Sequence, residues 1–177
     1  MHLKIIDFIN QNKNWRDVLS EAPYYLSIKD DGEYTILKYN QTSSDFSNDY
    51  VKESRGLIIR KDGDSYIPVC VPFLKFFNFG EPNTADIDWS SAKTYEKVDG
   101  SLVKLWYDKG EWHISTNGTI DAYKAEVQAG FTKQSYGELI KKVLDRDYKD
   151  FQFDKNKVYL FEFTSPENRV IIRYTED

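Results

Sequence analysis

Apolar residues near the start of the chain recur at helical spacing. Leu3, Ile6 and Ile9 lie three residues apart, and a second group within residues 15–19 continues the spacing until Pro23. An apolar residue every three or four positions places one face of a helix against a core, and proline has no N–H with which to continue a helix. The pattern predicts two short helices before Pro23.

Beyond Pro23 the apolar period changes to two, which is the period of a strand with one buried face. Short polar turns, several of them containing glycine, separate the strand-like segments, as in β-hairpins. The predicted strands are residues 24–28, 34–39, 56–60, 66–71, 94–98, 102–107, 112–115, 158–163 and 170–174. The first four form two hairpins on either side of a polar loop over residues 40–53, and the next three form one antiparallel set.

One longer segment, residues 121–147, carries an apolar stripe at helical spacing. The stripe consists of Leu139, Ile140, Val143 and Leu144. Together the elements predict an α+β fold, in which antiparallel sheets have flanking helices. The 177 residues suffice for one domain with a sizeable core and are too few for two of usual size, so we expect a single domain over residues 1–177.

Composition narrows the class of protein. Hydrophobic residues make up 40% of the chain, which excludes disorder, and no apolar run approaches the roughly 20 residues that cross a bilayer. The first ten residues lack the apolar centre of a secretory signal, and Cys70 has no second cysteine with which to form an internal disulfide. We therefore expect a cytoplasmic protein with no membrane partner.

Charge and histidine content exclude other functions. The formal net charge is −5, so any contact with RNA or phosphate must depend on a local group of cations. His2 and His113 are the only histidines. A zinc site of cysteines and histidines, or a histidine-based catalytic triad, therefore lacks the residues it needs.

One short segment has the composition of a nucleophilic site. Glu96-Lys97-Val98-Asp99-Gly100 places a lysine just before a glycine turn. A lysine amine can attack phosphorus, Gly100 permits a positive φ and close approach to a ligand, and Asp99 can accept hydrogen bonds that hold the turn. Asp-Gly is also the commonest turn dipeptide, so on its own the segment is more often a plain charged turn.

Three further segments accompany this turn: Glu53-Ser54-Arg55-Gly56, then Lys75-Phe76-Phe77-Asn78, and later Leu160-Phe161-Glu162-Phe163. With the KxDG pattern at Lys97, they resemble the ATP-dependent RNA ligases of the phage RNA ligase 1 type, within the covalent nucleotidyltransferase superfamily. The resemblance runs from about Tyr34 to Tyr174. It implies an ATP-grasp-like nucleotidyltransferase core, ATP and Mg²⁺ as cofactors, RNA ends as partners, and RNA repair, including that of tRNA, as the role.

The resemblance also assigns roles to residues. Lys97 is the expected nucleophile that forms lysyl-AMP, and Glu162 is expected to hold the ribose hydroxyls of ATP. Arg55 and Lys75 match cationic positions that face the phosphates, and Phe77 matches an aromatic beside the nucleotide. The remaining expected nucleotide-binding residues are Glu96, Asp99, Gly100 and Asn117. No metal ligands are assigned.

Physical reasons support several of these roles. Attack by lysine needs the free amine, so its ordinary pKa of about 10.4 must be lowered by nearby cations such as Arg55, Lys75 and a divalent ion. The same cations would stabilise the departing pyrophosphate. Glu162 interrupts an apolar strand and shares a face with Leu160, away from both phenylalanines, so it requires a partner or an open cleft.

The sequence departs from the family in two places. Asn117 stands where family members have a lysine, which removes one charge from the site. The chain also stops at Asp177, before the family's Glu-Gly and Lys-x-Lys motifs, so we expect a truncated core: a fragment, one half of a split ligase that pairs with a separate C-terminal half, or a shortened relative. The alternatives are a catalytically incomplete nucleotide- or RNA-end-binding module, and a DNA ligase or capping guanylyltransferase.

Overall fold

The computed structural model describes all residues except 1, 130–131, 169–171, 173 and 176–177. The elements, in chain order, are α1 (Lys4–Gln11), α2 (Trp15–Ser20), β1 (Ser27–Asp31), β2 (Tyr34–Lys38), α3 (Asp49–Glu53), β3 (Arg55–Asp62), β4 (Ser65–Cys70), β5 (Ser101–Asp108), β6 (Glu111–Thr116), η1 (Ala122–Lys124), β7 (Glu126–Ala129), β8 (Thr132–Ser135), α4 (Tyr136–Asp147) and β9 (Tyr159–Phe163). Every paired strand is antiparallel to its neighbour, which confirms the α+β class. No helix among the described residues is long and apolar enough to cross a membrane.

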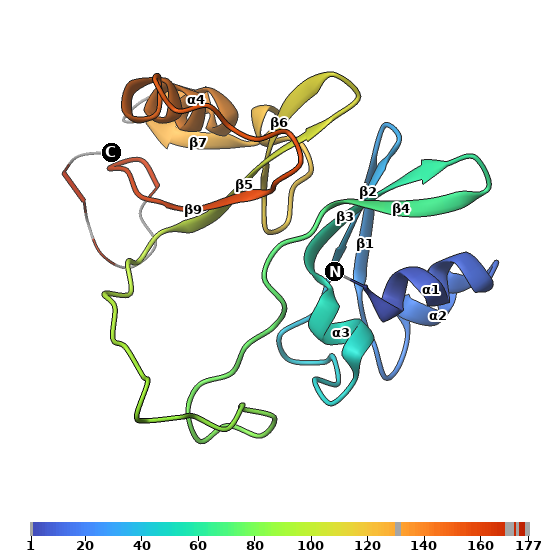
Figure 1. Cartoon of the computed structure of the whole chain (residues 1–177). Helices are drawn as coiled ribbons and strands as arrows, with labels where there is room; N and C mark the ends of the chain where they lie inside the picture. The colour runs from blue at the N-terminus through green and yellow to red at the C-terminus, as the bar shows by residue number, and fades with distance from the viewer. Residues whose placement is uncertain (1, 130–131, 169–171, 173, 176–177) are drawn as a thin grey trace.

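Two antiparallel sheets carry the fold, with helices on their outer sides (Figure 1). The four-stranded sheet has the order β1-β2-β3-β4, and the three-stranded sheet has the order β6-β5-β9. A separate hairpin, β7-β8, leads into α4. Figure 1 also shows the chain between β4 and β5 running away from both sheets before it returns to β5.

The strands of the larger sheet bury both faces, because their apolar residues are consecutive. Leu57 and Ile59 on β3 pack with α1 and α2, whereas Ile58 between them faces the other way. Ile58 joins Trp106 of β5 in a core between the two sheets. Both sheets thus contribute to a shared interior.

The outer face of the smaller sheet is covered by α4. Val103 of β5 and Phe163 of β9 pack with Leu139 and Ile140 of the helix. The side chain of Ser135 caps the start of α4 by accepting the N–H of Glu138 at 3.4 Å. The apolar stripe seen in the sequence is therefore the surface that α4 presents to the sheet.

Polar contacts fix one end of the interface between the sheets. Asp108, at the end of β5, accepts hydrogen bonds from the Arg60 Nε at 2.7 Å and the Tyr34 hydroxyl at 3.0 Å. The Tyr34 ring also meets Trp106 edge to face, with ring centroids 5.1 Å apart. The charges of Arg60 and Asp108 at this end of the interface are therefore paired.

The sequence predicted most elements, and three of its predictions need correction. Residues 94–98 form no strand, because β9 occupies the edge of β5 that they would have needed. Residues 121–135 hold the short 3-10 helix η1 and the strands β7 and β8, and the α-helix of the 121–147 segment is restricted to α4, where the stripe lies. The polar loop over residues 40–53 contains the short helix α3. The strand predicted at residues 170–174 falls largely outside the described residues.

Candidate active site

The lysine turn is tied to β9 through Glu162. The backbone N–H of Gly100 donates to the Glu162 Oε1 at 3.2 Å. Asp99 holds the other side, since its carboxylate accepts the N–H of Ile172 at 2.8 Å and its N–H donates to the Tyr174 hydroxyl at 3.1 Å. The prediction that Asp99 accepts a hydrogen bond is confirmed, although the donor lies beyond β9 and not within the turn.

Gly100 is required by close packing. A Cβ at this position would lie 2.4 Å from the carbonyl oxygen of Phe163 and 3.2 Å from the Glu162 Cγ. The prediction of a positive φ at Gly100 is wrong, because the φ of Gly100 is not in the positive range. Only a residue without a side chain lets the turn approach β9 so closely.

Glu162 lies on the face of its strand that points toward the four-stranded sheet. Phe161 and Phe163, its neighbours, pack on the α4 side. Glu162 is paired in register with Leu102 of β5, and cross-strand partners share a face. The prediction that Glu162 faces away from both phenylalanines is confirmed, and its side chain is exposed.

Arg55, the first residue of β3, is a cation beside Phe76. Its Nε and Nη1 are buried and have no hydrogen-bond partner within the described part of the chain. Its guanidinium stacks over the ring of Phe76 at 4.4 Å from the centroid. A buried guanidinium with unused donors is costly unless an anion or water meets it, which suits a site that receives a negatively charged ligand.

Lys75 and Phe77 lie close together next to α3. The Lys75 Nζ is 5.0 Å from the centroid of the Phe77 ring and 5.3 Å from that of Phe46. The backbone N–H of Lys75 donates to the carbonyl oxygen of Lys52 at 2.8 Å, which attaches this part of the chain to the larger sheet. Phe77 is half-buried and Phe76 is exposed, so neither is a core residue.

Asn117 follows β6 and lies against the start of β3. A Cβ at Gly56 would be 2.7 Å from the Asn117 Oδ1, and Gly56 has a φ of +84°. The Oδ1 is buried, and no described group donates to it. The register of β5 with β6 and β9 puts Asn117 and Glu162 on opposite sides of Leu102, about 10 Å apart across the sheet.

Lys104 is a buried cation that the sequence analysis missed. Its side chain is fully buried, and its Nζ donates to the carbonyl oxygen of Gly56 at 2.6 Å. Burial lowers the pKa of Lys104 to about 8, with a small opposing effect of Cys70. Its signal in the sequence was a lone lysine within the apolar run Leu102 to Trp106, on the same face as Glu162.

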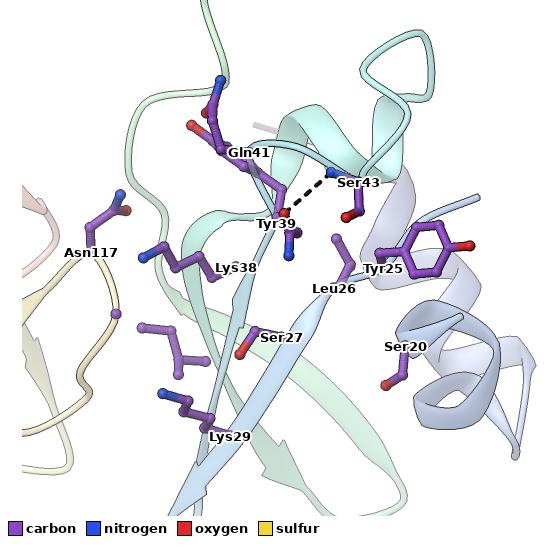
Figure 2. A pocket seen from close by; sticks show the side chains of 13 residues that line it. Ser20, Tyr25, Leu26, Ser27, Lys29, Lys38, Tyr39, Gln41, Ser43 and Asn117 are labelled. Carbon is purple, nitrogen blue, oxygen red and sulfur yellow. Dashed lines mark hydrogen bonds between the residues drawn. The ribbon is translucent and has the colours of Figure 1, made fainter. Parts of the chain in front are cut away.

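A cleft of about 760 Å³ opens beside Asn117. Its polar lining comes mainly from β1, β2 and the loop after β2, and no carboxylate contributes to it (Figure 2). The lining residues are Ser20, Tyr25, Leu26, Ser27, Lys29, Ile36, Lys38, Tyr39, Asn40, Gln41, Ser43, Asn117 and Gly118. In a chain with 24 basic and 29 acidic residues, such a lining creates a local excess of positive charge.

Lys97 and Glu96 lie in the exposed stretch that precedes β5. Neither residue is among those that line the 760 Å³ cleft. The described contacts therefore bring together two groups: Asp99 and Gly100 with Glu162, and Asn117 with Gly56 and Lys104. Both groups lie at the same end of the three-stranded sheet, where β5 begins and β6 and β9 end.

The described residues include no group of three or more His, Cys, Asp or Glu side chains that could hold a metal ion. Mg²⁺ bound to nucleotide phosphates takes only one or two carboxylates from a protein, so the expected Mg²⁺ remains a prediction. Chemically, the site offers a carboxylate acceptor for hydroxyl groups on one side and N–H donors for an anion on the other.

Comparison with known proteins gives a consistent result. The family described as RNA ligase matches residues 53–177. An RNA ligase of Rhodothermus phage RM378 is 29% identical over 180 aligned positions, which cover 85% of this chain and 41% of the phage protein. A protein of Autographa californica nuclear polyhedrosis virus, assigned as a bifunctional polynucleotide kinase/RNA ligase, is 32% identical over 171 positions, which cover 86% of this chain and 24% of the viral protein. The chain thus spans less than half the length of these relatives.

Proposed function

Because the chain belongs to the RNA ligase family, we propose that it is the adenylyltransferase part of an ATP-dependent RNA ligase. The hydrogen bond from Gly100 to Glu162 carries this proposal, since it joins the KxDG turn to the carboxylate expected to bind ribose. Lys104 is on β5, the strand next to β9, and its Nζ reaches the carbonyl oxygen of Gly56 on β3, the strand that begins with Arg55. We expect the phosphates of a nucleotide on this side.

In the proposed reaction, the uncharged amine of Lys97 attacks the α-phosphorus of ATP. A phosphorus–nitrogen bond forms, the bond between the α-phosphorus and the bridging oxygen breaks, pyrophosphate leaves, and the amine nitrogen loses a proton. The AMP then passes to the 5′-phosphate of an RNA end for RNA repair. Transfer of this kind depends mainly on positioning and charge neutralisation, which Glu162 and Arg55 supply, while Mg²⁺ neutralises phosphate charge when bound.

Lys97 is exposed, so the proposed reaction requires this lysine to move. The lysine must approach a nucleotide held at Glu162 from the stretch before β5, which has no strand pairing to hold it away. Asp99 and Gly100 are fixed to β9 and to the chain beyond it, so the movement is limited to the few residues before them. Nucleotide binding at Glu162 would supply the attraction, because the lysine charge and the phosphates are opposite.

Labelling with ATP tests the proposal directly. Incubation with α-labelled ATP and Mg²⁺ is expected to leave covalently bound label on the wild-type chain, stable to alkali and released by acid as a phosphorus–nitrogen bond requires, and none on Lys97→Ala. Lys93→Ala is the matched control, since Lys93 is exposed in the same stretch, and it should label as the wild type does. Equal label on Lys97→Ala, or none on the wild type, would contradict the proposal. GTP in place of ATP, and DNA ends in place of RNA ends, test the related superfamily activities.

A second candidate function is a nucleotide- or RNA-end-binding module that does not turn over. The neutral side chain of Asn117 at a position where the resemblance expects lysine favours it, as does the exposed position of Lys97. Saturable binding of ATP or 5′-phosphorylated RNA without any covalent product would support this function. Covalent label on Lys97 would rule it out.

A further inference from the structure

The start of β3 is surrounded by hydrogen-bond donors that lack acceptors. Two buried nitrogen atoms of Arg55, Nε and Nη1, have no partner among the described residues, and Lys104 uses one of its three N–H groups on the carbonyl oxygen of Gly56. No described carboxylate forms an ion pair with either residue. Buried charges in proteins are normally paired, because the loss of hydration is otherwise uncompensated.

Asn117 separates these buried donors from the open cleft. A Cβ at Gly56 would lie 2.7 Å from the Asn117 Oδ1 and 3.2 Å from the Lys104 Nζ, so both groups border the same small space. On the cleft side, a Cβ at Gly118 would lie 3.5 Å from the Lys38 Nζ. Figure 2 shows the Lys38 side chain directed toward Asn117 from β2. Two lysines from different sheets thus approach the loop at Asn117 from opposite sides.

We propose that Lys104 and Lys38 supply the positive charge of a polyphosphate subsite at Asn117, which holds the β- and γ-phosphates of the nucleotide and then the pyrophosphate that leaves. The proposal rests on the proposed function, since it names two binding residues of that same site. The amide of Asn117 contributes hydrogen bonds but no charge, and the two lysines replace the charge from either side. Lys104 acts from the interior and Lys38 from the cleft.

The chemistry of the donors favours polyphosphate over other anions. The unused N–H groups come from Arg55 and Lys104, and Lys38 and Lys29 in the cleft form no ion pair with a described carboxylate. Several donors without acceptors suit a ligand with many oxygens and a high negative charge, which a pyrophosphate group provides. Lys104 is two residues along β5 from Leu102, the partner of Glu162, so it lies on the same face of the sheet as Glu162.

Calorimetric titration with inorganic pyrophosphate and, separately, with AMP tests the assignment. Lys104→Met should weaken pyrophosphate binding by about 10- to 100-fold, the usual effect of losing a charged hydrogen-bond donor, and leave AMP binding unchanged. Lys38→Met should weaken pyrophosphate binding in the same direction by a smaller factor. Lys61→Met, which removes an exposed lysine from the far end of β3, is the matched control and should bind both ligands as the wild type does.

Proton uptake separates a phosphate-binding lysine from a structural one. Because the pKa of Lys104 is about 8, roughly half of the molecules lack this proton at pH 8, and a bound anion should draw it in. Cys70 on β4 is the titratable group that acts on Lys104, and its thiol stays protonated at this pH. Pyrophosphate also titrates near this pH, so the comparison is between variants: titrations in buffers of different ionisation heat should show about half a proton more taken up by the wild type than by Lys104→Met or Lys104→Arg.

The outcomes separate this inference from the proposed function. If Lys104→Met folds, as thermal unfolding would show, and binds pyrophosphate as the wild type does with the same proton uptake, the inference is wrong while labelling of Lys97 stands independently. If Lys104→Met does not fold, unchanged pyrophosphate binding by Lys38→Met and equal proton uptake by the wild type and Lys104→Arg refute it. A wild-type chain that binds neither pyrophosphate nor AMP and shows no label contradicts both.

Discussion

Gly100→Ala is the most direct test of the geometry that joins the lysine turn to β9. The new Cβ would lie 2.4 Å from the carbonyl oxygen of Phe163 and 3.0 Å from its carbonyl carbon. Carbon–oxygen contacts of this kind normally begin near about 3.3 Å, so the turn must retreat by about 1 Å. The obstructing atoms belong to the backbone of a paired strand and cannot rotate away.

This displacement of the turn should change the rate of the reaction more than the free energy of unfolding. It lengthens the hydrogen bond from the Gly100 N–H to the Glu162 Oε1, which is 3.2 Å in the native chain, and it carries Lys97 with it. A misplacement of about 1 Å can reduce a reaction rate by about 100-fold. Local overpacking at a partly exposed position is expected to lower the free energy of unfolding by about 1–3 kcal/mol.

The assay is the rate of covalent labelling with α-labelled ATP, with urea unfolding as the measure of stability. Gly32→Ala is the control, because Gly32 has a φ of +61° and no atom within 4 Å of its added Cβ. That variant should lose about 1 kcal/mol through backbone strain and keep the full labelling rate. If Gly100→Ala labels Lys97 at the wild-type rate, the close approach to β9 has no role in the reaction.

Three other substitutions or treatments test separate parts of the structure. Arg55→Met should fold normally, because it removes buried donors without partners, yet reduce labelling by about 100-fold; normal labelling would show that its guanidinium meets no phosphate. Burial alone would raise the pKa of Asp108, but hydrogen bonds from Arg60 and Tyr34 hold it below its usual value, so Asp108→Asn should lose about 2–3 kcal/mol in urea unfolding at pH 7. The difference should shrink as the pH falls through the folded-state pKa of Asp108, and a difference that persists at that acidity would contradict the assignment. Burial raises the pKa of the Cys70 thiol to about 12, so an aromatic disulfide reagent should react with it only after unfolding, and rapid reaction in the native protein would contradict its burial.

The elements that the sequence predicted well are those held by local contacts. The hairpins β1-β2 and β3-β4 were recognisable because a two-residue period on either side of a short glycine turn specifies both strands within about 15 residues. The strand predicted at residues 94–98 failed for the opposite reason. The edge of β5 that it needed is taken by β9, which lies some 60 residues farther along the chain, and no local pattern reveals that competition.

The same distinction applies to the site. The lysine turn and Glu162 could be predicted as a pair because the resemblance to the RNA ligases identified both, and the structure joins them by a hydrogen bond. Lys104 could not be predicted, because its burial depends on β3 and the chain after β6 closing around it. The polar lining of the 760 Å³ cleft escaped prediction as well, since its lysines, hydroxyls and amides come from several separate segments.

The two ends of the interface between the sheets differ in whether their charged side chains are paired. We interpret the paired end as structural and the unpaired end as functional. At one end, Arg60 and Asp108 are hydrogen-bonded to each other, and the charges cancel within the protein. At the other end, Lys104 and the Nε and Nη1 atoms of Arg55 are buried with donors unused, and neither residue forms an ion pair with a described carboxylate. Packing alone would favour apolar residues there, because a buried ion without a partner destabilises a fold. The cations at that end are therefore best explained by a negative charge that arrives with a ligand, which is the requirement of a site that binds the phosphates of a nucleotide.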